Sequence, residues 1–157
     1  MIRGGRHLVW PLLGVLTVCT AGCTVTTDSQ QVALSRATDS ARGLALATLT
    51  RLQAVRDPSA VGGALQDLVA NPKPATATIL LGTTSGSAGH FAADLSFFAA
   101  GDAGSGDGMA QVVVRLCAHY AGTIGTHGQV TVTDLTCPAL VPTKEFGFPA
   151  STVTLND

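Results

Sequence analysis

The chain has 157 residues, a formal net charge of −1 and an aromatic content of 4%. Its basic residues form no cluster and are not interleaved with aromatic ones, which argues against nucleic acid as a partner. The length suits a single domain, and because aromatic residues are scarce, its core must consist mainly of Ala, Val and Leu. Arg outnumbers Lys by seven to two, a bias typical of GC-rich bacterial genes.

The N-terminal segment has the three-part layout of a secretory signal peptide. Arg3 and Arg6 provide a basic start, an apolar run from Leu8 to Val18 follows, and the small residues Thr20 to Gly22 precede Cys23. The apolar run is shorter than the roughly 20 residues that a membrane-spanning helix needs. We therefore expect a cleaved leader, and a retained transmembrane helix is the weaker alternative.

The segment from Leu16 to Cys23, LTVCTAGC, resembles the lipobox of bacterial lipoprotein precursors. Small residues precede the cysteine and polar residues follow it, although Thr20 stands where these families usually carry Leu. The resemblance implies that Cys23 becomes the mature N-terminus and carries a diacylglycerol, often with a further acyl chain such as palmitate. Two or more acyl chains anchor a protein stably. Soluble secretion is the alternative, and Cys19 is a poorer candidate because bulky Val18 precedes it.

Two helices are expected after Cys23. The first runs from about Ser29, which could cap it together with Asp28, to Val55, and Pro58 ends its pattern. A shorter helix, weakened by two glycines, covers residues 59–70. The apolar stripe of the long helix should pack on the chain's own sheet, with a partner helix as the alternative. This stripe consists of Leu34, Ala37, Ala41, Leu44, Ala45, Thr48, Leu52 and Val55.

From residue 75 onward the pattern becomes that of β-strands. Residues 76–81 form a first strand, and residues 90–99 alternate in a way that favours a strand, although their alanines would also suit a helix. Residues 111–120 are the clearest strand, with 129–137 as the hairpin partner and 151–155 as an edge strand. Val112, Val114, Leu116, Ala118 and Tyr120 share the predicted core face of the clearest strand, and Val113, Arg115, Cys117 and His119 share the other. We therefore predict an α+β domain, with a long and a short helix packed on an antiparallel sheet of four to five strands.

Cys117 and Cys137 are the other two cysteines of the expected mature chain. If their strands pair about His127, then Cys117 lies opposite Cys137, His119 opposite Leu135 and Val113 opposite Val141. Opposed side chains on one face come close to disulfide distance, and an exported compartment permits oxidation. We predict a Cys117–Cys137 disulfide that links the hairpin.

Two other chemistries remain open at this point. Zinc is an alternative for Cys117, His119, His127 and Cys137, although their spacing matches no common zinc module. A Ser-His-Asp site would need Ser85 or Ser87 with His90 and Asp94, and spacing alone gives it no support. We therefore expect no catalytic residues, no metal and no cofactor.

The sequence predicts three parts: a signal peptide over residues 1–22, the lipidated Cys23 with a short tether over residues 23–29, and a single extracytoplasmic domain over residues 30–157. Loss of Arg3 and Arg6 would change the net charge from −1 to −3, so electrostatic attachment to anionic lipid is not expected. The membrane is instead the expected partner through acyl chains on Cys23, at the outer face of the cell membrane.

For the exported domain we expect a non-enzymatic accessory role with an envelope protein as partner. A carrier for a small apolar ligand or lipid is the alternative. An apolar cavity of a few hundred cubic ångströms between helix and sheet would favour the carrier. A solid core with an exposed apolar patch would favour the protein partner.

Overall fold

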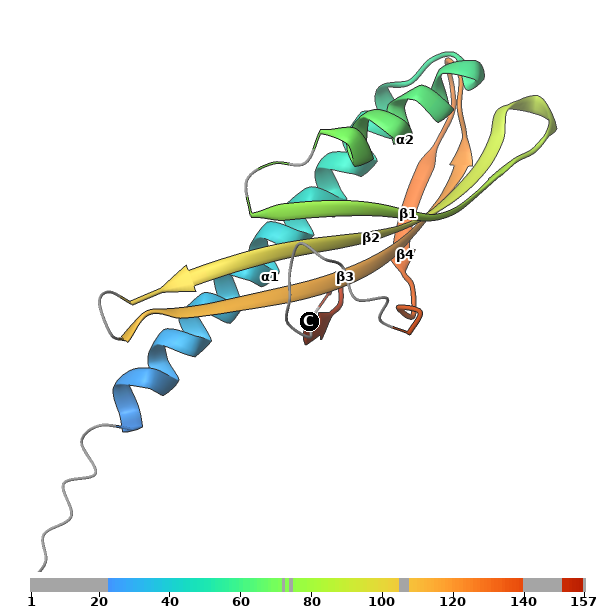
Figure 1. The fold of residues 1–157 in the computed structure, drawn as a ribbon. Helices are drawn as coiled ribbons and strands as arrows, with labels where there is room; N and C mark the ends of the chain where they lie inside the picture. Colours follow the sequence, from blue (N-terminus) through green and yellow to red (C-terminus); the bar gives the residue numbers. More distant parts are fainter. Residues whose placement is uncertain (1–22, 72, 74, 105–107, 140–150, 157) are drawn as a thin grey trace, which may run out of the picture.

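The computed structural model describes residues 23–71, 73, 75–104, 108–139 and 151–156, with side chains from Asp28 onward. Two helices pack on a five-stranded sheet, which confirms the predicted α+β class (Figure 1). The elements are α1 (Cys23–Ala54), η2 (Pro58–Ala60), α2 (Val61–Ala70), β1 (Thr76–Ser85), η3 (Ser87–Gly89), β2 (His90–Ala103), β3 (Ala110–Thr123), β4 (Val130–Asp134) and β5 (Ser151–Val153).

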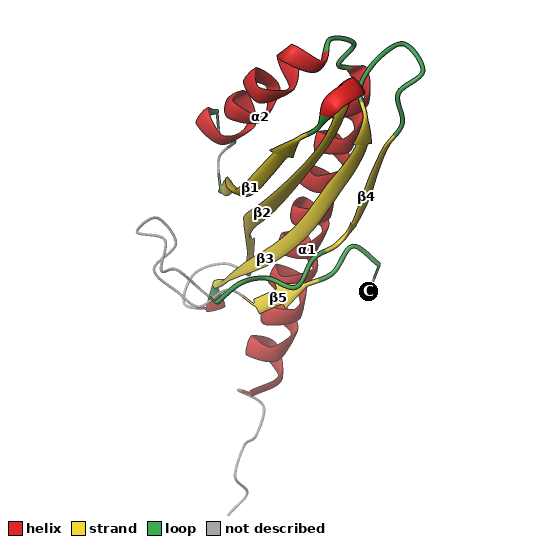
Figure 2. Cartoon of the chain, turned by 90° about the vertical axis from the view of Figure 1, so that its right-hand side faces the viewer, coloured by secondary structure: helices red, strands yellow, loops and turns green. Residues whose placement is uncertain are grey.

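The sheet has the order β1-β2-β3-β4, and β5 joins the same edge of β3 as β4 (Figure 2). β4 pairs with β3 from Ala118 to Gly122, so the backbone groups of Val114 to Leu116 need another partner, which β5 supplies. β5 runs parallel to β3. The sheet is therefore mixed, which corrects the prediction of a purely antiparallel sheet.

Helix α1 begins at Cys23, about six residues earlier than the sequence pattern predicted. Asp28 and Ser29 therefore lie inside the helix rather than capping it, and residues 23–29 are helical instead of an extended tether. Helix α1 contains no proline and only one glycine, Gly43, so it has no strong helix breaker. The first turns of α1 extend beyond the end of the sheet (Figure 1).

A stripe of small side chains brings α1 against the sheet. Ala33, Ala37, Ala41 and Ala45 recur every four residues, and all four are fully buried. The predicted stripe was correct for most of its members, but Leu34 is 39% exposed and Ala33 takes its place. Because alanine has only a methyl group, the helix backbone approaches the strands closely. The approach is tightest at Gly101 of β2, where an added Cβ would overlap the backbone of Ala33 and Ala37.

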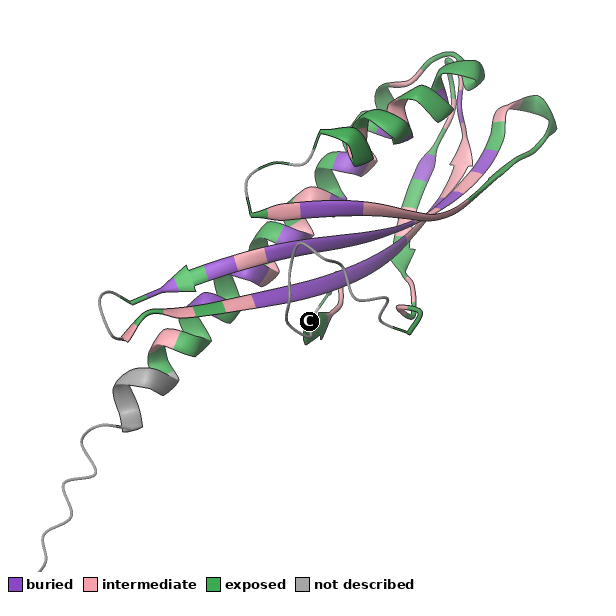
Figure 3. Cartoon of the chain, viewed as in Figure 1, coloured by how far each residue is buried: buried purple, intermediate pink, exposed green. Residues whose placement is uncertain are grey.

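The long β2–β3 hairpin forms the centre of the sheet, and its side chains alternate as predicted. Phe91, Ala93, Leu95, Phe97 and Ala99 of β2 face α1 together with Val114, Leu116, Ala118 and Tyr120 of β3. Figure 3 shows these two strands as the most continuously buried part of the molecule. Residues 90–99, for which the sequence also allowed a helix, thus form part of a strand. In a strand every second side chain lies on the same face, so this face can be buried against α1.

The register of the β3–β4 hairpin differs from the prediction by two residues. His119 lies opposite Thr133 rather than Leu135. The ladder pairs centre the hairpin on Thr126 rather than His127. Within the turn, Gly128 N–H donates to Gly125 O at 3.1 Å. The predicted Val113–Val141 pair involves a residue outside the described part of the chain.

The close approach of α1 can be tested at Gly101. A Gly101→Ala substitution should lower the free energy of unfolding by about 1–3 kcal/mol, because the new methyl group collides with the backbone of α1. Gly43→Ala is the matched control: Gly43 is an exposed position of the same helix with open space around it, and alanine there should add up to about 1 kcal/mol. Denaturant unfolding measures both variants, and equal stability of the two would contradict the packing described.

Candidate functional site

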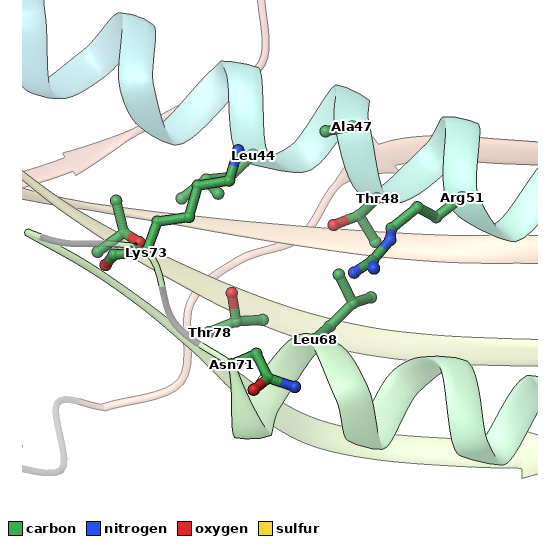
Figure 4. A pocket seen from close by; sticks show the side chains of 9 residues that line it. Leu44, Ala47, Thr48, Arg51, Leu68, Asn71, Lys73 and Thr78 are labelled. Atoms are coloured by element: carbon green, nitrogen blue, oxygen red, sulfur yellow. Dashed lines mark hydrogen bonds between the residues drawn. The ribbon is translucent and has the colours of Figure 1, made fainter.

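A cleft of about 460 Å³ lies between α1, α2 and strand β1 (Figure 4). It exists because α2 packs against the C-terminal part of α1 through Val61 and Leu65 and then returns the chain to the sheet edge. Its lining consists of Leu44, Ala47, Thr48 and Arg51 from α1, Leu68 from α2, Asn71 and Lys73 from the connection, and Thr76 and Thr78 from β1. A volume of this size is in the range of small-molecule sites.

The cleft combines an apolar surface with positive charge. Leu44, Ala47 and Leu68 supply the apolar part, and the side chains of Arg51 and Lys73 reach into the cleft from opposite sides (Figure 4). Among the described residues its lining contains no carboxylate. Neither Arg51 nor Lys73 forms an ion pair or a side-chain hydrogen bond with a described residue. The described part of the cleft therefore has a positive charge.

The neutral polar groups of the cleft are mostly used within the protein. Asn71 Nδ2 donates to Asp67 O at 3.3 Å, and Thr76 Oγ1 donates to Lys73 O at 2.8 Å. The buried Thr48 side chain interacts with the hydroxyl of Tyr120 beneath the cleft. These bonds hold the lining in place.

Tyr120 fixes α1 to the sheet below the cleft. Its ring is fully buried and packs edge-on against Phe97, with the ring centroids 6.3 Å apart. Its hydroxyl donates to Ala45 O of α1 at 2.8 Å. Burial raises the pKa of Tyr120 well above its ordinary value, and the hydrogen bond with Thr48 offsets only part of this rise.

The two cysteines predicted to pair form a disulfide on the sheet face away from α1. Cys117 and Cys137 have Cα atoms 5.3 Å apart. β4 ends at Asp134, and Leu135 N–H donates to Cys117 O at 3.0 Å, so the chain bends back after the ladder and brings Cys137 to Cys117. The pairing was predicted correctly, although the register used to predict it was wrong. With both sulfurs joined, the proposed zinc set loses two of its four ligands.

A buried arginine lies beside the disulfide. Arg115 Nε donates to Ser96 Oγ at 2.8 Å and Nη1 donates to Pro138 O at 2.7 Å, while the guanidinium lies 5.5 Å from the ring centre of Phe98. Burial lowers the pKa of Arg115. These contacts tie the segment that follows Cys137 to the centre of the sheet, which is a structural role.

His119 and Asp94 lie opposite each other on β3 and β2, with Nδ1 and Oδ1 2.6 Å apart. They border a shallow hollow of about 240 Å³ next to Thr83 and Thr84. Asp94 thus pairs with His119 and not with His90, whose Nδ1 lies 3.4 Å from Thr123 Oγ1. The hypothetical Ser-His-Asp set is therefore not assembled. Among the described residues, no group of three or more His, Cys, Asp or Glu side chains could hold a metal ion.

Cys23, the predicted lipidation site, is the first residue of α1. Its side chain lies outside the described part of the structure, so the acylation of this residue stays a prediction. Within the described ranges, neither helix has the length and apolar character needed to cross a membrane.

Sequence reasoning missed the cleft. Arg51 stood out only as a charge off the apolar stripe of α1, and Lys73 as part of a helix-breaking Asn-Pro-Lys-Pro segment. One signal was present: the two cations flank the predicted short helix, which must fold back toward α1. The distance between them depends on how α2 packs, and the sequence pattern does not contain that information.

No family model, curated protein or solved structure matches this chain. The function is therefore inferred from the residues of this chain and their arrangement.

The buried hydroxyl of Tyr120 predicts a pH dependence that can be followed spectroscopically, because the chain has only one tyrosine. The pKa is higher in the folded than in the unfolded chain, so this contribution to stability is complete below about pH 10 and is lost as the pH rises further. We expect the native chain to show no tyrosinate absorbance at pH values where the unfolded chain does.

A Tyr120→Phe variant is the control for this titration. It should unfold with about 1 kcal/mol less stability near neutral pH, because the bond to Ala45 is lost, and its stability should fall less steeply in alkali. Ionisation of Tyr120 in the native chain with a midpoint near pH 10 would contradict the buried environment.

Proposed function

We propose that this chain is a non-enzymatic lipoprotein of the bacterial envelope, anchored by acyl chains on Cys23 to the outer face of the cell membrane. The observation that carries the proposal is the leader followed by the LTVCTAGC segment, in which small residues precede Cys23. In this proposal, attachment depends on the acyl chains of Cys23.

The start of α1 at Cys23 gives this proposal a geometric consequence. An α-helix rises about 1.5 Å per residue, so the first buried residue, Ala33, is about 15 Å along the helix from Cys23. The cleft residues Leu44 to Arg51 are about 30–40 Å along it. In a lipid-anchored chain, α1 would act as a stiff stalk that holds the domain near the membrane and the cleft away from it when the helix stands upright.

Two binding roles are compatible with an anchored domain, and the cleft favours one of them. Five large apolar side chains are exposed among the described residues, and they are spread over α1, α2 and a loop. They are Val32, Leu34, Leu46, Val69 and Met109. Scattered single residues of this kind are common on monomeric proteins and give little support to a protein-docking patch. The cleft between the helices and β1 has the expected volume, and its lining is in part apolar, which supports a carrier. Ligand carriage is therefore our second candidate function, next to an accessory role with an envelope protein.

A non-enzymatic role leaves the pair of His119 and Asp94 to be explained. Asp94 orients this histidine, but among the described residues no hydroxyl or thiol is hydrogen bonded to its Nε2, as a nucleophile would be. The nearby sulfur of Cys117 is held in the disulfide. The pair is best explained as a cross-strand contact between β2 and β3.

The anchor can be tested by substitution of Cys23. In a bacterial host that processes lipoproteins, Cys23→Ser should move the protein from the membrane fraction to the soluble extracytoplasmic fraction or leave the leader uncleaved, because serine cannot form the thioether. Cys19→Ser is the matched control and should leave the protein in the membrane fraction in its processed form. Metabolic labelling with a palmitate analogue, read together with fractionation, distinguishes these outcomes. Labelled, membrane-bound Cys23→Ser protein would refute the anchor.

A further inference from the structure

The cleft between α1, α2 and β1 has a charge pattern that indicates what it binds. We propose that it takes a single-chain organic anion, with a carboxylate group near Arg51 and Lys73 and a short hydrocarbon body against Leu44 and Leu68. This inference deepens the carrier function proposed above and rests on it.

The charge of the lining selects the head group. Arg51 and Lys73 bring two positive charges into a cleft in which no described lining residue is a carboxylate, and neither is neutralised by an ion pair with a described residue. A guanidinium matches the two oxygens of a carboxylate, and a lysine ammonium adds a second charged donor. A neutral alcohol could use one of these donors but would gain no charge-assisted bond.

The apolar residues and the volume select the body of the ligand. Leu44, Ala47 and Leu68 offer hydrocarbon contacts in the same cleft as the two charged groups. A cleft of about 460 Å³ equals the volume of roughly 15 water molecules at about 30 Å³ each. That space suits a chain of about ten carbons with its carboxylate and is too small for a phospholipid with two long chains.

The position of the cleft along α1 also favours a single-chain ligand. Arg51 lies 28 residues after Cys23 on one continuous helix, which is about 42 Å along the axis. A ligand that reaches the cleft of an upright, anchored domain must leave the bilayer. A short single chain does so more readily than a lipid with two long chains, since each buried methylene contributes about 0.8 kcal/mol and the single chain has fewer of them.

Binding of decanoate to the full chain tests this proposal. The protein is placed in nanodiscs of neutral phosphatidylcholine, and uptake of labelled decanoate is measured by equilibrium dialysis against empty nanodiscs. Decanol provides the same chain without the charge. We expect saturable binding of decanoate and at least about tenfold weaker binding of decanol, because the alcohol lacks the charge-assisted bonds.

Charge-removing variants locate the site. Arg51→Gln and Lys73→Gln should each weaken decanoate binding about tenfold and leave decanol binding unchanged. Arg56→Gln is the matched control, because Arg56 is an exposed cation just beyond α1 that does not line the cleft. Thermal unfolding of each variant checks that the fold is kept.

A further variant keeps both charges but fills the space. Ala47→Phe places a ring at the cleft wall and should abolish the binding of both probes. Equal affinities for decanoate and decanol, unaffected by the two charge-removing variants, would overturn the anionic ligand and leave a carrier for neutral molecules. Saturable binding of neither probe would overturn both the ligand class and the carrier function, whereas the anchor at Cys23 would still be decided by its own substitution.

Discussion

The close approach of α1 to the β2–β3 hairpin is the constraint on which the rest of the structure depends. Four alanines at four-residue spacing and Gly101 on the facing strand remove the side-chain bulk that would hold the two layers apart. The short separation lets polar groups reach across. Tyr120 bonds to Ala45 O, Arg42 Nε to Thr154 O at 2.9 Å, and Gln53 Nε2 to Val130 O at 3.1 Å. These bonds attach one helix to β3, to the start of β4 and to the residue after β5.

This arrangement also explains where binding could take place. The alanine stripe packs directly on the sheet, and the cleft lies beside it, where α2 covers the sheet edge at β1. The connection after α2 brings Lys73 to the side of the cleft opposite Arg51. The opposite sheet face is occupied by the disulfide and by Arg115, whose partners are Ser96 and Pro138 O. One face therefore gives the domain its rigidity, and the edge of the other offers room for a ligand.

Much of the fold could be predicted from local pattern. The alternating faces of β3 and most of the apolar stripe of α1 were predicted correctly, because side-chain periodicity and burial are linked within one element. The Cys117–Cys137 pair was also predicted correctly. The β3–β4 register was wrong because Gly125 and Gly128 set the turn, and periodicity does not reveal which glycine closes it. The parallel direction of β5 and the presence of Arg51 and Lys73 in one cleft depend on contacts between distant segments. No local pattern records such contacts.

Hydrogen exchange followed by mass spectrometry tests the central claim most directly, because it reports how α1 is held in the intact chain. If the alanine stripe packs against β2 and β3 as described, amides from Ala37 to Leu52 should exchange only when the whole domain unfolds, as slowly as those of the central hairpin. Amides before Ala33, on the part of α1 that extends past the sheet, should exchange much faster. Rapid exchange from Ala37 to Leu52 while β2 and β3 stay protected would contradict the account, because the helix would then not depend on the sheet.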